Sequence, residues 1–252
     1  MSALQSYLRA NAATGRETER IGPFLATFSP RSANRFLNYA VPDDGAVPTA
    51  SEVEALAEAY RRRNLLPRLE FMTDTAPEAE PALRAAGFAL ERRVPVMTCP
   101  PGQAVTQPEP AGTTLVVPGA DAEYAAMLSA QHEAYDSLDP VTDDDVAGAK
   151  DNVARGGLAV VAFDRETGEA AGGGVADVIT DGFTELAGFG VRARYRRRGI
   201  AAAITECLTR RAHERGAHLP FLTPAGPPEA RIYARAGYRP ASEMVHLSRE
   251  NT

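Results

Sequence analysis

Four arginines lie close together where an apolar segment gives way to a helical pattern, and a glycine follows them directly. They are Arg194, Arg196, Arg197 and Arg198, followed by Gly199. The first turn of a helix has unpaired backbone N–H groups and a positive dipole end, and Gly199 has no side chain to obstruct a ligand. Such a turn can bind a phosphate or a pyrophosphate. A solvated basic turn is the alternative interpretation, since most charge runs are solvated.

A strand and a helix are expected to position these arginines. The segment 183–191 follows the turn-forming pair Asp181-Gly182 and is predicted to be a strand. From residue 199 onward, apolar residues recur at the helical period and predict an amphipathic helix. These residues are Ile200, Ile204, Cys207, Leu208 and Ala212. A strand before the turn and a helix after it are the context that phosphate binding requires.

The rest of the C-terminal half is expected to combine strands and helices. Apolar patterns predict strands at 113–117, 158–163, 173–179, 218–223 and 238–247, and helices at 120–135, 142–155 and 228–236. Three consecutive glycines at 172–174 predict a bulge or a close backbone approach. The segment 100–112 is rich in proline, glycine and polar residues, which predicts a linker. The expected domains are therefore 1–99 and 113–252.

Three segments of the C-terminal half resemble the GNAT superfamily of acyl-CoA-dependent N-acyltransferases. Arg196-x-x-Gly199-x-Ala201 resembles the family signature (Arg/Gln)-x-x-Gly-x-(Gly/Ala). The strand 185–191 before it is similar to the fourth strand of the family, and the later pattern Tyr233-x-x-x-Gly-Tyr is similar to its second hallmark. The resemblance covers 113–252. It implies a mixed α/β (α+β) fold, in which helices flank a central, mostly antiparallel sheet.

The resemblance also implies a site for acetyl-CoA as co-substrate, without a metal ion. The loop would hold the pyrophosphate, and the pantetheine arm would dock against the end of the strand like an added strand. Backbone N–H groups of that strand would polarise the thioester carbonyl. The residues expected to bind the cofactor are Phe189, Gly190, Val191, Arg196, Arg197, Arg198, Gly199, Ile200 and Ala201.

Glu185 and Tyr233 are the candidate catalytic residues. Glu185 is the only acidic residue of the strand 183–191, and it matches a position where the family often has a glutamate that helps to deprotonate the amine. Tyr233 resembles the tyrosine that protonates the leaving thiolate in many members, and an unperturbed tyrosine keeps its proton at pH 7. The alternatives are a solvent-facing glutamate on a strand and a packed aromatic residue on a helix.

The loop between the first two helices of the domain is where the fold commonly sets acceptor specificity. Here it is the acidic segment 136–145. Its carboxylates are expected either to attract a cationic amine or to cap the next helix, with Thr142 as N-cap and Asp143 to Asp145 complementing the helix dipole.

The N-terminal half matches the end of the C-terminal half at a constant spacing of 150 residues. Val41, Phe71 and Gly87 correspond to Val191, Phe221 and Gly237. Helices expected at 51–63 and 81–86 and strands expected at 67–72 and 89–97 also coincide with those of the second half. A constant spacing of this kind favours a tandem repeat of two GNAT-like halves.

The two halves differ at the residues that could do chemistry. The segment 46–51 corresponds to the arginine loop 196–201 but has neither a positive charge nor a glycine. Arg35 corresponds to Glu185, and Leu83 corresponds to Tyr233. The first half is therefore expected to be a degenerate GNAT-like domain with a structural role, and the chain to hold one cofactor site.

Composition limits the possible partners. The 252 residues are 44% hydrophobic and 24% charged, with a net charge of −6. One basic loop in an acidic chain argues against nucleic-acid binding and favours a small anionic ligand. No apolar run is long enough to span a membrane, and the N-terminus lacks the pattern of a signal peptide. The two cysteines lack metal-ligand spacing and fit a reducing compartment, so we expect a cytoplasmic protein.

These observations predict an N-acetyltransferase in which an amine, expected to be a small molecule, attacks acetyl-CoA directly in a ternary complex. No cysteine is placed for a covalent relay. Two alternatives stay open: a non-catalytic module that binds acyl-CoA or a protein partner, and an enzyme that acetylates proteins or peptides. The oligomeric state is left open.

Overall fold

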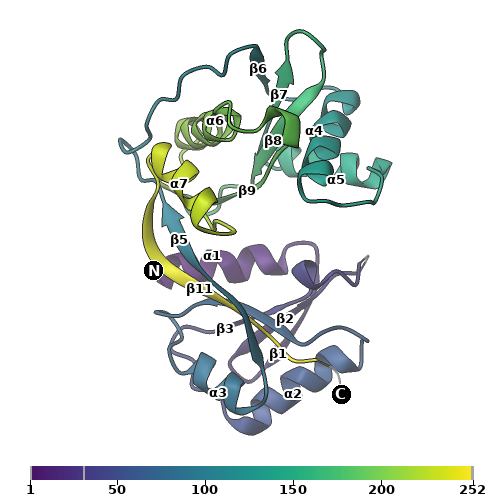
Figure 1. The fold of residues 1–252 in the computed structure, drawn as a ribbon. Helices are drawn as coiled ribbons and strands as arrows, with labels where there is room; N and C mark the ends of the chain where they lie inside the picture. Colours follow the sequence, from purple (N-terminus) through teal and green to yellow (C-terminus); the bar gives the residue numbers. More distant parts are fainter. Residues whose placement is uncertain (1, 31, 251–252) are drawn as a thin grey trace. The chain divides into compact units, whose positions relative to one another are not determined.

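The computed structural model describes residues 2–30 and 32–250 (Figure 1). The chain forms two compact units. The first contains residues 1–96 and 241–252, and the second contains residues 97–240. Each unit is described by itself below. In the described parts of both, no helix is long and apolar enough to cross a membrane.

In its described residues, the first unit is a sheet with the strand order β1-β2-β3-β4-β11-β5 and three α-helices. Its strands β3 and β4 are parallel, and β11 is antiparallel to β4. Along the chain its elements are α1 (Ser2–Ala13), β1 (Glu17–Ile21), β2 (Phe24–Phe28), the 3-10 helix η1 (Arg35–Leu37), β3 (Ala40–Pro42), α2 (Ala50–Arg61), β4 (Arg68–Met72), α3 (Ala79–Ala85), β5 (Ala89–Thr98) and β11 (Arg239–Ser248).

The last strand of the chain, β11, completes the core of this first unit. Val245 and Leu247 are fully buried beside Leu69 and Phe71 of β4, in the core that α2 and α3 also contribute to. The alternation of buried and exposed residues along a strand explains why these two face the core. Residues 241–248 therefore lie with the first unit in space, although they end the segment 113–252 in sequence.

The second unit is a mixed sheet with the order β10-β9-β8-β7-β6, and the end of β5 pairs beside β10. Among the described residues, its strand pairs are antiparallel except β9 with β10, which confirms the expected mostly antiparallel α/β fold. The elements are β6 (Thr113–Val116), α4 (Asp121–Ala134), α5 (Asp143–Ala154), β7 (Leu158–Asp164), β8 (Ala170–Ala176), β9 (Phe183–Val191), the 3-10 helix η2 (Ala193–Tyr195), α6 (Ile200–Glu214), β10 (Leu219–Leu222) and α7 (Pro227–Arg235).

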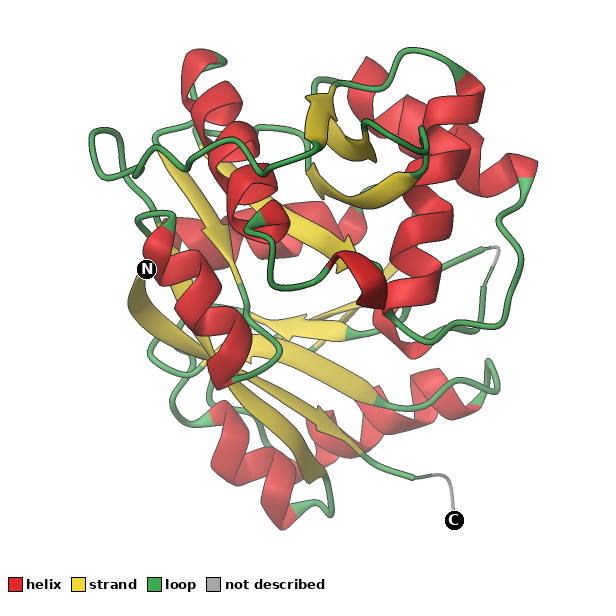
Figure 2. Cartoon of the chain, turned by 45° about the horizontal axis from the view of Figure 1, so that its top comes forward, coloured by secondary structure: helices red, strands yellow, loops and turns green. Residues whose placement is uncertain are grey.

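Helices cover both faces of this second sheet (Figures 1 and 2). Val160 of β7 lies in the core that includes Ile204 of α6, whereas the next residue, Val161, lies in the core that includes Met127 of α4. Neighbouring residues of one strand thus face opposite layers. The two layers are α6 with α7, and α4 with α5.

The segment 100–112, which was expected to be a linker, contains no helix or strand but belongs to the second unit. It nevertheless contacts the end of α7 closely. The N–H of Val105 donates to the carbonyl of Ala236 at 3.0 Å, and the side-chain amide of Gln107 donates to that of Arg235 at 2.9 Å. A Cβ atom at Gly237 would lie only 2.1 Å from the carbonyl oxygen of Gln103. The segment therefore caps the C-terminus of α7.

Candidate functional site

Strands β9 and β10 pair over only a short stretch. Their parallel register runs from Phe183 with Leu219 to Glu185 with Phe221. Beyond Glu185, β9 pairs with β8 alone among the described strands. The edge of β9 from 186 to 191 is therefore without a strand partner on the β10 side, and an extended ligand can add to such an edge.

A β-bulge interrupts β9 along this edge. Gly173 pairs with Gly190, but Val175 pairs with Ala187, so two residues of β9 face one residue of β8. One of the two, Gly188, has a φ of 64°, a conformation that glycine adopts without strain. The other is Phe189.

Helix α4 packs directly on this part of the sheet. A Cβ atom at Gly173 would lie 2.4 Å from Cγ of Met127, and one at Gly190 would lie 2.7 Å from Cα of Gln131. The close backbone approach predicted for the glycines at 172–174 is confirmed at Gly172, where a Cβ atom would lie 2.5 Å from the carbonyl oxygen of Gly190. β8 begins at Ala170 rather than at 173, so these glycines lie inside the strand.

The turn before α6 leaves the start of that helix open. Gly199 is the N-cap residue with a φ of 83°, no side chain caps the helix, and its first turn has no acidic residue. A Cβ atom at Gly199 would meet nothing within 4 Å, so the backbone angle and not crowding requires glycine here. Within the described residues, no acceptor is found for the backbone N–H groups of 197–202. These groups can bind an anion.

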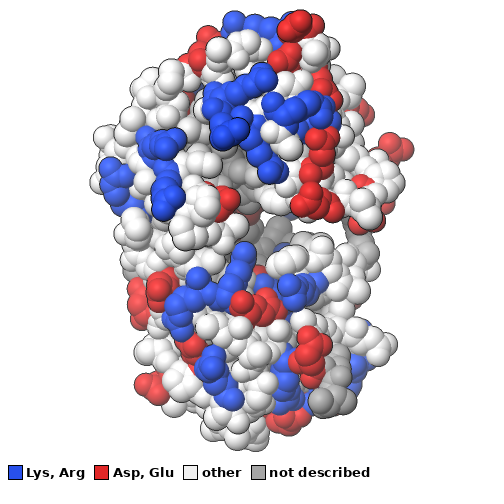
Figure 3. All heavy atoms as spheres, in the orientation of Figure 1, with Lys and Arg blue, Asp and Glu red and all other residues white. Residues whose placement is uncertain are grey.

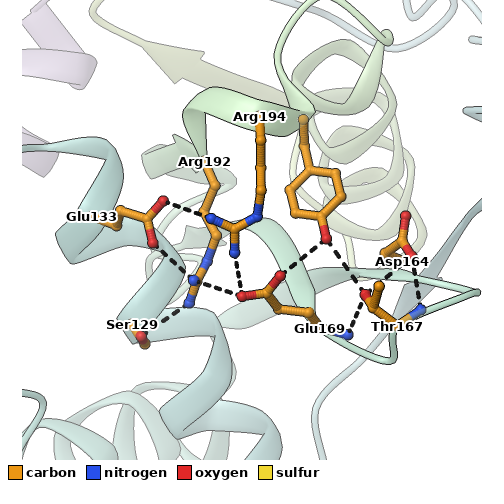
Figure 4. Close-up of polar contacts among 8 residues, drawn as sticks. Ser129, Glu133, Asp164, Thr167, Glu169, Arg192 and Arg194 are labelled. Atoms are coloured by element: carbon orange, nitrogen blue, oxygen red, sulfur yellow. Dashed lines mark hydrogen bonds and ion pairs between the residues drawn. The ribbon is translucent and has the colours of Figure 1, made fainter.

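Arg194 of the arginine run, together with Arg192 just before the run, is engaged by acidic side chains (Figure 4). Arg192 donates to Glu133 of α4 at 2.8 Å and to Glu169 at 3.0 Å. Arg194 forms ion pairs with the same two carboxylates. Glu169 also accepts from the hydroxyl of Tyr195 at 3.0 Å, and the hydrogen bond from Arg194 is the main reason that its pKa is lowered. This network attaches the loop to α4 and to the β7–β8 connection.

The other three arginines remain near the open helix start. Arg196 turns back, and its Nε donates to the carbonyl of Val191 at 3.1 Å. Arg197 and Arg198 are exposed, and neither forms an ion pair with any carboxylate in the described parts of the chain. Basic side chains gather near the start of α6, with acidic ones beside them (Figure 3). Arg197 and Arg198 are therefore the cations available to an anionic ligand.

Tyr233 lies beside the bulge. It is buried on α7, and its ring centroid lies 5.3 Å from that of Phe189. Burial raises the pKa of its hydroxyl, with a smaller contribution from Tyr135, so the group stays protonated at neutral pH. Half-buried Glu185 precedes Leu186, which packs in the α6–α7 core. By strand alternation Glu185 projects to the other face of β9, so the two candidate residues flank the strand from opposite sides.

Comparison with known proteins agrees with this geometry. Residues 124–238 match the model of the acetyltransferase (GNAT) family. This segment is a GNAT domain. Among solved structures, a GCN5-related N-acetyltransferase from Kribbella flavida is 25% identical, with a TM-score of 0.83 over 100% of this chain and 96% of that chain. None of the curated proteins compared with the chain matches it.

Two more distant structures share the fold of the GNAT domain and its companion unit. A GCN5-related N-acetyltransferase from Sphaerobacter thermophilus is 18% identical, with a TM-score of 0.69 over 91% of this chain and 81% of that chain. A tandem GNAT protein from the clavulanic acid biosynthesis pathway is 14% identical, with a TM-score of 0.64 over 89% and 77%.

The acidic loop of the GNAT domain has a capping function. Thr142 is the N-cap of α5, and its N–H donates to Asp145 at 2.8 Å while its hydroxyl accepts from the N–H of Asp145 at 3.2 Å. The capping alternative is therefore confirmed for this pair. Asp143 and Asp144 remain exposed. No group of three metal-ligating side chains is present among the residues that the structure describes.

Gln131 of α4 and Tyr135, the C-cap residue of that helix, were not singled out from the sequence. The side-chain amide of Gln131 donates to the carbonyl of Gly188 at 2.6 Å, and the hydroxyl of Tyr135 donates to that of Phe189 at 3.1 Å. The apolar pattern predicted the helix, but its polar contacts depend on how the helix packs on β9. No local signal in the sequence marks these two residues.

Proposed function

We propose that the GNAT domain transfers an acetyl group from acetyl-CoA to the amine of a small molecule. The observation that carries this proposal is the open start of α6, with its free N–H groups and exposed Arg197 and Arg198, next to the unpaired edge of β9. A pyrophosphate suits the first feature and an extended pantetheine arm the second. The residues proposed to bind the cofactor are those at 189–191 and 196–201.

The reaction is direct attack in a ternary complex. Glu185 accepts a proton from the ammonium group, directly or through water, which frees the amine lone pair. The amine nitrogen attacks the thioester carbonyl, a C–N bond forms, the C–S bond breaks, and the nitrogen releases its remaining extra proton to water, which gives the neutral amide. Tyr233 donates its proton to the leaving thiolate, since burial keeps the hydroxyl protonated. Backbone N–H groups of β9 stabilise the negative charge that develops on the carbonyl oxygen.

The first unit is proposed to be a degenerate GNAT-like half with a structural role. Its β5 runs over 89–98 and β11 runs over 239–248, again 150 residues apart, which supports a tandem origin. The start of its helix α2 is closed by Thr49 and Glu52, so we propose one cofactor site per chain. Two free, buried cysteines support a cytoplasmic location.

Calorimetric titration with acetyl-CoA and with CoA tests the first step, and we expect both to bind below millimolar concentration. Release of the CoA thiol is then measured across a panel of small amines, aminoglycosides, amino acids and peptides. Absence of binding would contradict the proposal. Binding without thiol release for any amine would instead support a non-catalytic acyl-CoA module, and release with peptides alone would support a protein acetyltransferase.

A further inference from the structure

Gln131 has an unusual position for a polar side chain. It is 6% exposed on α4, and its amide nitrogen donates to the carbonyl of Gly188 in the bulge of β9 at 2.6 Å. A Cβ atom at Gly188 would lie 2.9 Å from this nitrogen. The amide therefore fills the space that a side chain at 188 would occupy, and a buried amide of this kind is costly unless it is hydrogen-bonded.

The register places the peptide between Gly188 and Phe189 outside the hydrogen-bonded pairs that β9 forms with β8. The N–H of Arg192 donates to the carbonyl of Ala171, and the N–H of Asp177 donates to that of Glu185, both at 2.9 Å. Hydrogen-bonded pairs alternate in antiparallel ladders. When this alternation is followed along the register from each observed bond towards the bulge, the next hydrogen-bonded pairs are Gly173 with Gly190 and Val175 with Ala187. Gly188 and Phe189 lie between them.

The direction of the Gly188 carbonyl determines the direction of the next N–H group. No peptide bond in the described chain is cis, so the N–H of Phe189 points opposite to the carbonyl of Gly188. That carbonyl points to Gln131 on the α4 face. The N–H of Phe189 therefore points to the α6–α7 face, where the Phe189 side chain packs beside Tyr233.

We propose that Gln131 is a positioning residue, which orients the N–H of Phe189 so that it donates to the thioester carbonyl oxygen of acyl-CoA. This inference rests on the proposed function of the domain. Tyr135 assists, because its hydroxyl holds the carbonyl of Phe189 at 3.1 Å and so fixes the following peptide from the C-cap of the same helix. The Gln131 amide is neutral, so it fixes the peptide without adding a charge that would repel or trap the substrate.

The geometry has a chemical consequence. As the amine attacks, the carbonyl oxygen gains negative charge, and a donor already held in place stabilises that charge without reorganisation. Without Gln131 the small, flexible Gly188 could rotate, and the Phe189 N–H would lose its fixed direction. The hydrogen bond from this N–H to the carbonyl oxygen of bound acetyl-CoA would already be weaker before any reaction. The inference can therefore be tested by measuring binding alone.

The test compares acetyl-CoA with S-ethyl-CoA, a thioether that lacks the carbonyl oxygen. We expect the wild-type protein to bind acetyl-CoA more tightly, by roughly two- to tenfold for one hydrogen bond. In Gln131→Glu the ionised carboxylate has no proton to donate. The affinity ratio, which is the affinity for acetyl-CoA divided by that for S-ethyl-CoA, should therefore fall towards one, while the affinity for S-ethyl-CoA is unchanged. Mildly acidic buffer should partly restore the ratio, because a protonated carboxyl can donate again.

Asn152→Asp is the matched control. Asn152 also donates its side-chain amide to a strand carbonyl, that of Ala176 in β8 at 3.1 Å, but it does not contact the bulge. This variant should keep the wild-type ratio at both pH values. Tyr135→Phe removes only a hydroxyl from a side chain that is 59% exposed, so it should fold normally and lower the ratio by a smaller factor.

The outcomes separate the two proposals. If the wild-type protein binds both ligands but Gln131→Glu and Tyr135→Phe keep its affinity ratio, the inference is wrong and the proposed function stands. If the wild-type protein binds neither ligand, the proposed function fails and the inference fails with it. If Gln131→Glu does not fold, an unchanged ratio in Tyr135→Phe is sufficient to overturn the positioning role.

Discussion

The starts of α2 and α6 lie at equivalent positions of the proposed tandem repeat, and one is closed whereas the other is open. Each helix begins at corresponding positions, 150 residues apart, at Ala50 and Ile200. Thr49 caps α2 and forms a capping box with Glu52, whereas Gly199 leaves α6 without a side-chain cap. One end is satisfied within the protein, and the other leaves the N–H groups of its first turn without an acceptor among the described residues.

The carboxylate of Glu52 lies where an anion would be attracted in the second half. It accepts from the N–H and the hydroxyl of Thr49, at 2.8 and 2.7 Å, and these bonds lower its pKa, the backbone bond most. A Cβ atom at Gly22 would lie 2.5 Å from Glu52, so this side chain also occupies the adjacent space. The first half therefore gains helix stability at the point that corresponds to the proposed anion site of the second half.

The comparison extends to other positions where a side chain could take part in a reaction or bind a ligand. Leu83, which corresponds to Tyr233, is fully buried in the apolar core of the first unit. Arg68 and Glu70 of β4 form a buried ion pair, whereas the second half has His218 and Pro220 at the corresponding positions. The first half thus uses these positions for packing and ion pairing. The predictions below test whether the two halves divide stability and chemistry in this way.

Tyr233→Phe should have the largest effect on the reaction. General acid catalysis typically contributes about 10²- to 10⁴-fold, so we expect kcat to fall at least about hundredfold while the affinity for acetyl-CoA stays the same. Steady-state kinetics with an acceptor from the amine panel measures this. Tyr60→Phe, which removes a buried hydroxyl of the first unit that donates to Thr27, is the control and should keep kcat. Unchanged turnover in Tyr233→Phe would remove Tyr233 from the mechanism.

Glu70→Gln should strongly destabilise the first unit. Arg68 is fully buried and is held by Glu70, by Glu91 at 3.1 Å and by His246 at 2.7 Å. Removing one partner of a buried ion pair costs about 3 kcal/mol or more of unfolding free energy, measurable by urea denaturation. Glu243→Gln removes an exposed partner of Arg93 and should cost less than about 1 kcal/mol. Equal losses in both variants would contradict a specific role for the buried pair.

The same glutamate predicts how stability depends on pH. Burial opposes ionisation of Glu70, but hydrogen bonding to His246 and the charge of Arg68 outweigh it and lower its pKa from 4.5 to about 2. Because the folded pKa is below the unfolded one, the stabilisation is complete above pH 4.5 and is lost as the pH falls towards 2. Denaturation series across this window should show a weaker acid dependence in Glu70→Gln than in the wild-type protein.

Ala201→Glu would give α6 the kind of acidic first turn that α2 has. Two like charges about 4 Å apart repel by roughly 4 kcal/mol near a protein surface, so the affinity for acetyl-CoA should fall on the order of hundredfold. The helix dipole should meanwhile favour the carboxylate by about 0.5 kcal/mol. Titration and thermal unfolding are measured together, with Ala201→Gln as the neutral control. Tight binding by Ala201→Glu would show that the anion does not lie at this helix start.

The sequence was sufficient for the elements whose apolar pattern is regular. The strand 183–191 was predicted with the bounds that the structure gives, and α5 and α7 lie within a residue or two of their expected ranges. The start of β8 was missed because Ala170, Ala171 and Gly172 have little strand preference. The strands β1 to β3 were not predicted at all. In β1 four of the five residues, Glu17–Arg20, are polar or charged, which hides the strand pattern.

The site was predictable only where it depends on local sequence. The signature around Gly199 located the open helix start, because the glycine angle and the missing cap are properties of a few adjacent residues. The contacts of Gln131 and Tyr135 join residues 57 and 54 positions apart. They depend on glycines that let α4 approach the sheet, and a pattern within one segment does not encode that packing. The contacts of Arg192 with the carboxylates of Glu133 and Glu169 also depend on packing between separate segments.

Thr49→Ala should have the smallest effect, and it tests the closed side of the comparison. Loss of an N-cap threonine costs about 1 kcal/mol of unfolding free energy, and Thr142→Ala, which removes the corresponding cap of α5, should cost about the same. Neither variant should change the affinity for acetyl-CoA, because neither threonine lies at the open start of α6. Weaker binding in Thr49→Ala alone would mean that the first half takes part in holding the cofactor, and one open helix start would then no longer account for the site.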